Sequence, residues 1–322
     1  MQQGHHWQWS LILSIFILSI FLNLSFGSIH FDMNEWLNAL TNTQSTAHHI
    51  LLELRLPRTI NALLVGASLA TAGLLLQVLL RNPLAEPYIL GTSAGATLVT
   101  LSAIIFGVSS LFLPILSFLG ALLSLALLLL INKKGALLKN DRLLLTGVMF
   151  AALSAALINI LLVANSDLPL RPLLYWIMGD LRNEVAPLSS SIAILISLLL
   201  AISISPQLNQ LLQGETIARS LGINTQRLQK QILLLSALLT ALAVSIAGSL
   251  GFIGLVAPHI SRLLFGFQHK KLILASMING MSLVLLADLG SRLLLLPQQL
   301  PVGAMTALLG APLFIYLLNK KS

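Results

Sequence analysis

The chain has 322 residues, of which 57% are hydrophobic and 9% are charged, and its mean hydropathy is +0.92. A soluble domain carries about 25% charged residues, so this composition excludes a water-soluble globular protein. Cysteine is absent, which excludes disulfides, thiolate metal sites and cysteine nucleophiles. The net charge of +8 comes from 18 Lys and Arg residues scattered singly or in pairs, a pattern that does not indicate nucleic-acid binding. We therefore expect an integral membrane protein.

Crossing the hydrocarbon core of a bilayer takes about 20 mostly apolar residues. We expect the first apolar stretch to be a retained span, because no convincing small-residue cleavage site follows it. The expected spans are 9–29, 57–80, 90–109, 111–132, 143–164, 186–205, 231–250, 252–267, 272–296 and 300–318. The sequence therefore predicts an all-α membrane protein of about ten transmembrane helices, packed as one domain over residues 1–322.

Basic residues predict the orientation of these spans, because loops rich in Lys and Arg stay in the cytoplasm. With the N-terminus inside, thirteen basic residues face the cytoplasm and five face outward. The five outward residues are Arg55, Arg58, Arg171, Arg182 and Arg292. Because the number of expected spans is even, both termini are expected on the cytoplasmic side.

A weak internal repeat occurs at a shift of 175 residues. Its residues are Ala72, Gly73, Pro83 and Gly91, which recur as Ala247, Gly248, Pro258 and Gly266. The spans that carry the two copies run in opposite directions under the expected topology. The halves would then be inverted repeats, an arrangement common among transporters that alternate access around a central site. Chance is the alternative, because Ala and Gly are abundant in this chain.

The segment from Arg81 to Gly95, RNPLAEPYILGTSAG, interrupts the hydrophobic pattern. Its prolines predict that a helix ends by Asn82, and a new helix is expected near Gly91. The small residues that follow favour close packing of helix backbones. They also fit the G-x-S-x-G nucleophile elbow, with Ser93 as the nucleophile and His259 as its base. That elbow belongs on a strand-to-helix turn of a soluble sheet, so we favour the packing interpretation.

The longest polar interval expected on the cytoplasmic side covers residues 206–231. Within it, glycines bound a helix of about two turns from Gly214 to Gly222, and Glu215 suits the positive N-terminal end. The residues expected to share its apolar face are Ile217, Ala218 and Leu221. A helix this short is not stable alone, so its apolar face requires a partner surface. The residues leave open whether that partner is the membrane domain, the lipid interface or a cytoplasmic subunit.

A second glycine-rich segment runs from Gly248 to His259, GSLGFIGLVAPH, and we expect its proline to end a helix. We interpret His259 as a packed or capping residue rather than as a ligand. Asp288 and Arg292 are four residues apart and are expected to pair on one helix. Two adjacent histidine pairs near the N-terminus lack further ligands at metal spacing, so no metal is expected.

Six strings of residues occur in order over nearly the whole chain beyond residue 50. They are Leu54 to Thr59 (LRLPRT), Asn82 to Pro87 (NPLAEP) with Gly91, Gly214 to Gly222 (GETIARSLG), Gly251 to His259 (GFIGLVAPH), Leu286 to Arg292 (LADLGSR) and Gly310 to Phe314 (GAPLF). Together they are highly specific. Through them the chain resembles the membrane permeases of bacterial ABC importers for cobalamin and iron-siderophore complexes.

The resemblance implies a type II ABC importer permease, with ten helices in each of two permease subunits. The second permease is either a copy of this chain or a related chain. The resemblance also implies two cytoplasmic ATPase subunits and a periplasmic or lipid-anchored substrate-binding protein, assembled at the bacterial inner membrane. It implies no cofactor and no enzyme activity in this chain, because ATP hydrolysis belongs to the ATPase partner. Consistently, the sequence has no G-x-x-x-x-G-K-[ST] loop.

The resemblance also assigns roles to particular residues. The segment that looks like the coupling helix held in a groove of the ATPase comprises Gly214, Glu215, Ile217, Ala218, Arg219, Leu221 and Gly222. The arginines that match those meeting carboxylates of the substrate-binding protein are Arg55, Arg58 and Arg292. The structural motif residues are Asn82, Pro83, Glu86, Pro87, Gly91, Gly251, Gly254, Pro258 and His259.

The external segment from Tyr175 to Glu184 keeps the Trp and Gly of this family but adds Asp180, Arg182 and Glu184. The resemblance implies that the binding protein largely chooses the cargo. We expect an iron-siderophore complex because more members of this family carry iron chelates, with a corrinoid or heme as alternatives. An ion-coupled secondary transporter is the rival from another class. It would keep ionisable residues near the bilayer midplane, whereas the expected spans place Asp288 and His259 toward their ends.

Overall fold

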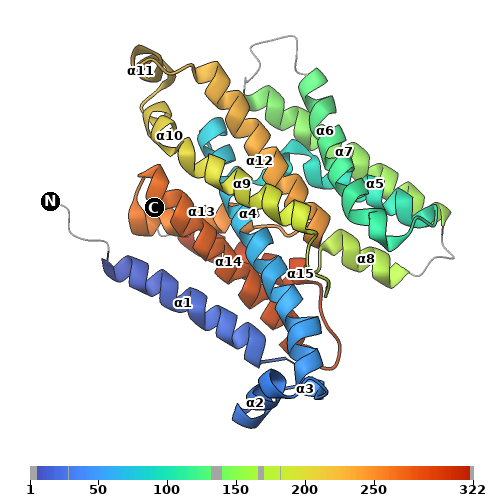
Figure 1. Ribbon diagram of the computed structural model, residues 1–322. Helices are drawn as coiled ribbons and strands as arrows, with labels where there is room; N and C mark the ends of the chain where they lie inside the picture. Colours follow the sequence, from blue (N-terminus) through green and yellow to red (C-terminus); the bar gives the residue numbers. More distant parts are fainter. Residues whose placement is uncertain (1–5, 28, 132–139, 166–169, 182, 320–322) are drawn as a thin grey trace.

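The computed structural model describes residues 6–27, 29–131, 140–165, 170–181 and 183–319. Within these ranges all regular structure is helical (Figure 1). The α-helices are α1 (His6–Ser25), α2 (Met33–Thr41), α3 (Thr46–His49), α4 (Leu56–Leu80), α5 (Thr92–Ile105), α6 (Leu113–Ile131), α7 (Asn140–Ala164), α8 (Leu170–Met178), α9 (Leu188–Ser203), α10 (Ser205–Leu212), α11 (Glu215–Ser220), α12 (Thr225–Ala247), α13 (Ile253–Phe265), α14 (His269–Leu293) and α15 (Val302–Asn319). Three short turns of other helix types are η1 (Ile50–Arg55), η2 (Pro87–Leu90) and η3 (Ser110–Phe112).

Ten of the described helical segments correspond to the ten predicted membrane spans. Six are long and apolar enough to cross a membrane alone, namely α1, α4, α6, α7, α12 and α14. The pair α9 and α10, which is bent by 48°, passes the same test of length and composition only when its two helices are taken together. The shorter apolar helices α5, α13 and α15 account for the remaining three. The predicted all-α membrane fold is therefore confirmed.

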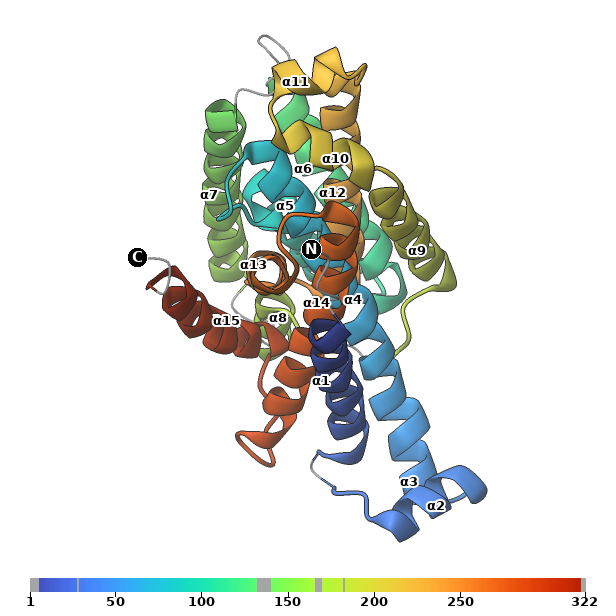
Figure 2. The same cartoon turned by 90° about the vertical axis from the view of Figure 1, so that its left-hand side faces the viewer.

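Two helices, α4 and α14, form the centre of the bundle, with α1, α12 and α13 packed around them (Figures 1 and 2). Their backbones approach closely where Gly66 meets Gly280. A Cβ atom added to Gly66 would lie 2.5 Å from the Gly280 carbonyl oxygen, so no side chain fits there. Such close approach provides van der Waals contact that lipid cannot match, and it stabilises helix association inside a membrane.

The outer helices expose apolar side chains over much of their length. On α7, for example, Leu145, Leu153 and Ile160 are all exposed. Exposed leucine and isoleucine on this scale are unfavourable in water but are expected where a helix faces lipid. The distribution of apolar residues therefore agrees with a multi-pass membrane protein.

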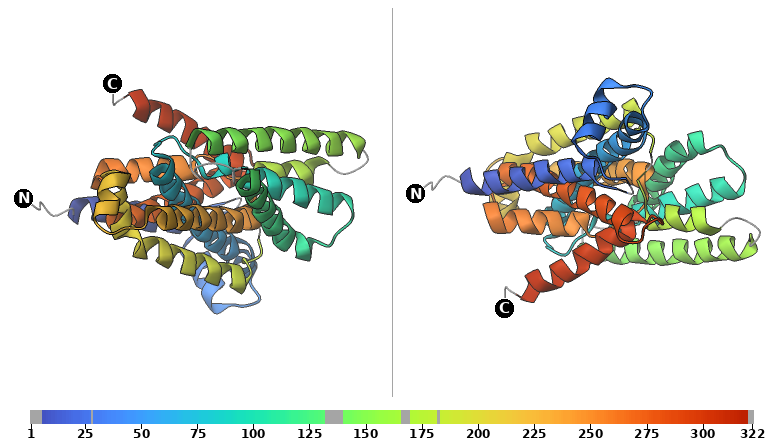
Figure 3. Two further views of the ribbon diagram at one scale, coloured as in Figure 1. Left: turned by 90° about the horizontal axis from the view of Figure 1, so that it is seen from above. Right: turned by 90° about the horizontal axis from the view of Figure 1, so that it is seen from below.

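The first turn of α1, the last turn of α15 and the α10–α11 segment lie toward the same end of the bundle (Figure 3). We call this the α11 end. Figure 2 shows α2 and α3 at the opposite extreme of the molecule, and we call that the arginine end. The start of the first helix, α1, and the end of the last helix, α15, lie at the same end, which fits an even number of crossings. The side of the membrane that each end faces stays a prediction. Several of the basic residues on which that prediction rests lie outside the described residues.

Pro258 lies inside α13, so the prediction that this proline ends a helix is wrong. A proline cannot donate to the carbonyl four residues earlier, which here belongs to Gly254. The side-chain amide of Gln77 donates to that carbonyl instead, at 3.4 Å, and compensates for the missing bond. Helix α12 ends earlier, before Gly248, whose φ of +66° only glycine adopts readily.

His259 lies at the centre of α13, so the prediction that it sits toward the end of a span is also wrong. Its imidazole is buried and packs edge-on against the ring of Phe314, with 5.8 Å between ring centroids. The interpretation of His259 as a packed residue agrees with this contact. Asp288 does lie near the end of its helix, as predicted.

The small residues after Gly91 pack α5 against α6, as predicted. A Cβ atom on Gly95 would lie 2.6 Å from the Gly120 carbonyl oxygen, and one on Gly120 would lie 2.6 Å from the Gly95 carbonyl oxygen. The residues just before this contact form the 3₁₀ turn η2. The strand-to-helix turn that a nucleophile elbow at Ser93 requires is therefore not formed here.

Two of the four residue pairs of the internal repeat occupy different local settings in the two halves. Gly73 lies within α4, whereas Gly248 lies just beyond α12. Pro83 lies in a turn, whereas Pro258 lies within α13. Ala72 and Ala247, by contrast, both lie buried within helices, and Gly91 and Gly266 both lie at helix ends with φ of +71° and +68°. The local structure therefore matches at two of the four positions of the repeat. The polar interval at 206–231 is itself mostly helical, because α10, α11 and the start of α12 fall within it.

Candidate functional site

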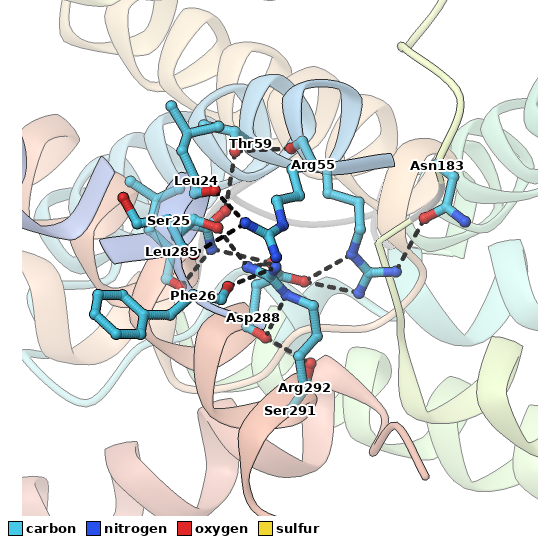
Figure 4. Close-up of polar contacts among 12 residues, drawn as sticks. Leu24, Ser25, Phe26, Arg55, Thr59, Asn183, Leu285, Asp288, Ser291 and Arg292 are labelled. Carbon is cyan, nitrogen blue, oxygen red and sulfur yellow. Dashed lines mark hydrogen bonds and ion pairs between the residues drawn. The ribbon is translucent and has the colours of Figure 1, made fainter. Parts of the chain in front are cut away.

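The carboxylate of Asp288, near the end of α14, is completely buried. Its Oδ1 accepts hydrogen bonds from Arg58 Nε at 2.9 Å and from Arg58 Nη2 at 2.7 Å. Its Oδ2 accepts one from Asn23 Nδ2 at 3.0 Å and lies 2.9 Å from Arg292 Nη2. One carboxylate thus joins α1, α4 and α14 (Figure 4). Because a buried charge is costly unless it is paired, these partners are what allow Asp288 to lie there ionised. The predicted pairing of Asp288 with Arg292 is present.

Arg55 belongs to the same group of arginines but binds main-chain carbonyls instead of a carboxylate. Its guanidinium donates to Leu24 O at 2.6 Å, to Ser25 O at 3.0 Å and to Ile29 O. The last carbonyls of a helix have no partner within that helix, and Leu24 and Ser25 occupy the last turn of α1. Arg292 acts similarly and donates to Asn23 O at 3.0 Å. The two arginines therefore cap the end of α1 (Figure 4).

Arg58 also contacts the segment between α8 and α9. Its Nη2 lies 3.2 Å from Asp180 Oδ1, and its Nη1 donates to Asn183 Oδ1 at 3.4 Å. One turn along α4, Asn61 donates to the main-chain carbonyl of Glu184 at 2.8 Å. Burial raises the pKa of the Asp180 carboxyl above its usual value, although the nearby Arg58 guanidinium opposes that shift. Helix α4 therefore holds the segment that contains Asp180 and Glu184.

A cavity of about 310 Å³ lies at the arginine end, and the lining residues include Arg55, Arg58 and Arg292. No Asp or Glu lines it among the described residues. The side chains of Arg55 and Arg58 are nearly fully buried and already hydrogen-bonded inside the protein. The structure thus brings the three predicted arginines together around one basic cavity. Of the two other arginines expected outside, Arg182 lies outside the described residues and so does the side chain of Arg171.

The helix predicted between two glycines is present at the opposite end of the bundle as α11. Gly222, with φ of +82°, ends it by donating to Arg219 O at 3.0 Å, and the next residue, Ile223, donates to Ala218 O at 3.1 Å. These two bonds form a Schellman cap, which requires the left-handed conformation that glycine adopts without strain. The glycine therefore fixes where α11 stops.

Two side-chain bonds tie α11 to α12. Gln229 Nε2 donates to Glu215 Oε1 at 2.6 Å, and Arg219 Nε donates to Thr225 Oγ1 at 3.0 Å. A helix this short cannot hold its own shape, so such bonds are needed to fix it on the bundle. Helix α11 is therefore bonded to the start of a long apolar helix at two points.

The apolar residues of α11 do not share one face as predicted. Ala218 is completely buried against the rest of the chain, whereas Ile217 and Leu221 are about half exposed. Residues four apart lie on one side of a helix, but the residue next to one of them points about 100° away. Ile217 and Leu221 therefore form the exposed apolar side, and Ala218 belongs to the internal packing.

The two glycine- and proline-rich motifs pack against each other. Glu86 accepts a hydrogen bond from the main-chain N–H of Phe252 at 2.5 Å, and Tyr88 bonds through its hydroxyl to the main chain of Leu250. Pro87 lies against Gly254, where an added Cβ atom would meet the proline ring at 2.5 Å. Glu86, Pro87 and Gly254 of the structural motif therefore form a junction between the α4–α5 connection and the start of α13.

Asn23 and Gln77 take part in these contacts but were not predicted, although the sequence marks both as unusual. Asn23 and Gln77 are polar residues inside apolar spans, and such residues are rare unless they bond to something. Thr59 donates to Asn23 Oδ1 at 2.9 Å and extends the Asp288 network. Their partners lie far away in the chain, so the sequence marks these positions without showing what they bind.

Known proteins share this architecture over nearly the whole chain. The vitamin B12 import system permease BtuC of Vibrio cholerae is 38% identical over 320 residues, covering 97% of this chain and 94% of the relative. YvrB of Bacillus subtilis, described as an uncharacterized ABC transporter permease, is 34% identical over 325 residues, covering 96% and 92%. A solved structure described as an inward-facing metal-chelate type ABC transporter is 30% identical with a TM-score of 0.84, covering 96% and 97%.

The helical bundle and these relatives define the chain as a multi-pass transport permease of the ABC importer class, with the type II importer fold. The chain matches the FecCD transport family over residues 15–320 and belongs to that family. The relatives are transport permeases of bacteria, which supports placement in the inner membrane. The resemblance found in the sequence is thereby confirmed at the level of the family.

We predict that Asp288→Asn destabilises the protein strongly. The substitution keeps the side-chain volume but leaves Arg58 and Arg292 buried without their shared carboxylate, and breaking a buried pair in this way costs about 3–5 kcal/mol. Thermal unfolding in nanodiscs should therefore occur at a clearly lower temperature. Asp180→Asn is the matched control, because it removes a partly exposed carboxylate and leaves Arg58 bound to Asp288. Equal unfolding temperatures for Asp288→Asn and the wild type would contradict the network.

Proposed function

We propose that this chain is the permease subunit of an importer that moves a metal chelate across the bacterial inner membrane, driven by a separate ATPase subunit. The arginine end faces the periplasm and the α11 end faces the cytoplasm. The observation that carries this proposal is the presence of two different contact surfaces at opposite ends of one bundle. One is a basic cavity with three arginines, and the other is a short helix with exposed apolar side chains.

The α11 end is proposed to contact the ATPase through Ile217 and Leu221. Their exposed apolar side chains lie on a helix bonded to α12 through Gln229 and Thr225. A lone exposed apolar side chain is common on any protein, but two that lie four residues apart, one within α11 and one at its C-cap, favour a partner surface. Motion of the ATPase would reach the membrane helices through α12.

The arginine end is proposed to receive acidic side chains of the substrate-binding protein. The cavity there carries three guanidiniums and no carboxylate among its described lining residues, so it presents positive charge to an approaching partner. Arg55 is the residue best suited to this contact, because its own hydrogen bonds go to neutral carbonyls rather than to a carboxylate. Arg58 and Arg292 also share the buried carboxylate of Asp288.

The proposed cargo class is a metal chelate. The relative named as a vitamin B12 permease supports a corrinoid, and the sequence resemblance supports an iron-siderophore complex. An uptake assay in which cobalamin and ferric siderophores compete distinguishes the two cargo classes. We also propose that residues 1–322 act as one transmembrane domain and that the functional unit contains a second permease subunit, either a copy or a related chain.

We predict that Leu221→Asp and Ile217→Asp abolish co-purification with the ATPase and abolish transport. Each places a charge in an apolar contact, which is strongly unfavourable unless the charge is paired. Because both side chains are exposed in the permease alone, insertion and thermal unfolding should stay as in the wild type. Gln226→Asp is the control, since it adds the same charge to an exposed position at this end. Undiminished co-purification and transport in both variants would refute the assignment of α11.

We predict that Arg55→Gln slows association with the substrate-binding protein several-fold and weakens its dependence on salt, because complementary charge chiefly accelerates encounter. The amide can still donate to the carbonyls of α1, and the pairs with Asp288 are untouched. Arg227→Gln at the α11 end is the charge-matched control. Binding kinetics in nanodiscs across a salt series measure both effects. An unchanged rate and salt slope in a normally folded Arg55→Gln protein would mean that Arg55 only caps α1.

A further inference from the structure

A second basic cavity, of about 360 Å³, lies at the α11 end. It forms where α4 and α13 end, where α14 begins and beside the last turn of α10. Two arginines line it, Arg81 from the cap of α4 and Arg262 from the last turn of α13. Neither residue takes part in the contacts proposed above for the ATPase or for the binding protein.

The charge of this cavity is not compensated by the protein. Arg262 Nη2 donates to Gln77 Oε1 at 2.8 Å, and its guanidinium lies 5.9 Å from the ring centroid of Phe267, so both partners are neutral. The exposed side chain of Arg81 has no hydrogen bond or ion pair with another described residue. No Asp or Glu is among the described residues that line the cavity. At the arginine end, by contrast, Arg58 and Arg292 are both paired with Asp288.

Two guanidiniums facing one cavity are suited to a phosphate, because each can donate two parallel hydrogen bonds to its oxygens. The apolar surroundings distinguish a lipid phosphate from a free one. Leu212 and Phe267 line the cavity and are exposed, as is Leu263 one residue beyond Arg262. A soluble anion gains no binding energy from exposed apolar side chains, whereas the acyl chains of a lipid pack against them.

The position of the cavity in the bundle agrees with a headgroup site. The apolar stretch of α4 ends at Leu80, and that of α13 ends at Phe265. The guanidiniums therefore lie at the level where spans emerge from the hydrocarbon, and basic pockets between helices at this level attract anionic headgroups. We propose that this cavity binds the phosphate of an anionic phospholipid, held by Arg81 and Arg262. The proposal does not depend on the cargo or on either partner contact.

The test is the stabilisation of the delipidated, detergent-solubilised protein by added lipid, since a ligand that binds only the folded state raises the unfolding temperature. The probes are phosphatidylglycerol, phosphatidylcholine with the same acyl chains, and inorganic phosphate. We expect phosphatidylglycerol to stabilise the wild type at the lowest concentrations. In Arg81→Gln, whose side chain is exposed, the apparent affinity for phosphatidylglycerol should fall about tenfold, as loss of a charged hydrogen-bond donor implies. Arg227→Gln, outside the cavity, should bind it like the wild type.

Four results would overturn the proposal. Equal affinity for phosphatidylglycerol in the wild type and in Arg81→Gln would show that the cavity does not hold the lipid. Full stabilisation by inorganic phosphate alone would identify a free-anion site, and equal stabilisation by phosphatidylcholine would identify purely apolar contact. Loss of ATPase co-purification in Arg81→Gln, with unchanged affinity for phosphatidylglycerol, would identify the cavity as a partner contact.

Discussion

The buried carboxylate of Asp288 is the interaction on which the arginine end of the molecule depends. It binds Arg58 from α4, Asn23 from α1 and Arg292 from its own helix, and Arg58 in turn holds the segment around Asp180. A charged group of this kind inside a membrane protein is costly, so its partners must be in place whenever the bundle is assembled. The network therefore fixes three helices and the segment between α8 and α9 relative to one another at a single point.

Helix α14 connects this network to the other end of the protein. At its first residue, His269 bonds through Nδ1 to Asn209 Oδ1 of α10 at 2.8 Å, and α10 leads directly into α11. Along its length it packs on α4 with no room for a side chain at Gly66 or Gly280. Two helices packed this closely move together more readily than they slide. The proposed contact surfaces are thus joined by a continuous, closely packed element.

The sequence was most informative where local chemistry decides the structure. Apolar length predicts the spans, Gly222 predicts the end of α11, and the small residues around Gly95 predict close packing. It failed where a distant group overrides a local rule. Pro258 continues a helix because Gln77, far away in the chain, bonds to the carbonyl that the proline leaves free. The capping of α1 by Arg55 likewise depends on the approach of helices that the sequence cannot place. Packing also decides which apolar residues of α11 are exposed. Ala218 and Ile217 are adjacent apolar residues in the sequence, but Ala218 is buried and Ile217 is exposed.

The central claim is that the arginine end faces the periplasm and the α11 end faces the cytoplasm. The chain contains no cysteine, so a single introduced cysteine reports on its own position. Gln298→Cys and Ser220→Cys place exposed thiols at the two ends. With a membrane-impermeant maleimide applied to spheroplasts, the account predicts labelling of Gln298→Cys before lysis and of Ser220→Cys only after lysis. Labelling of Ser220→Cys in intact spheroplasts, with Gln298→Cys protected, would contradict it.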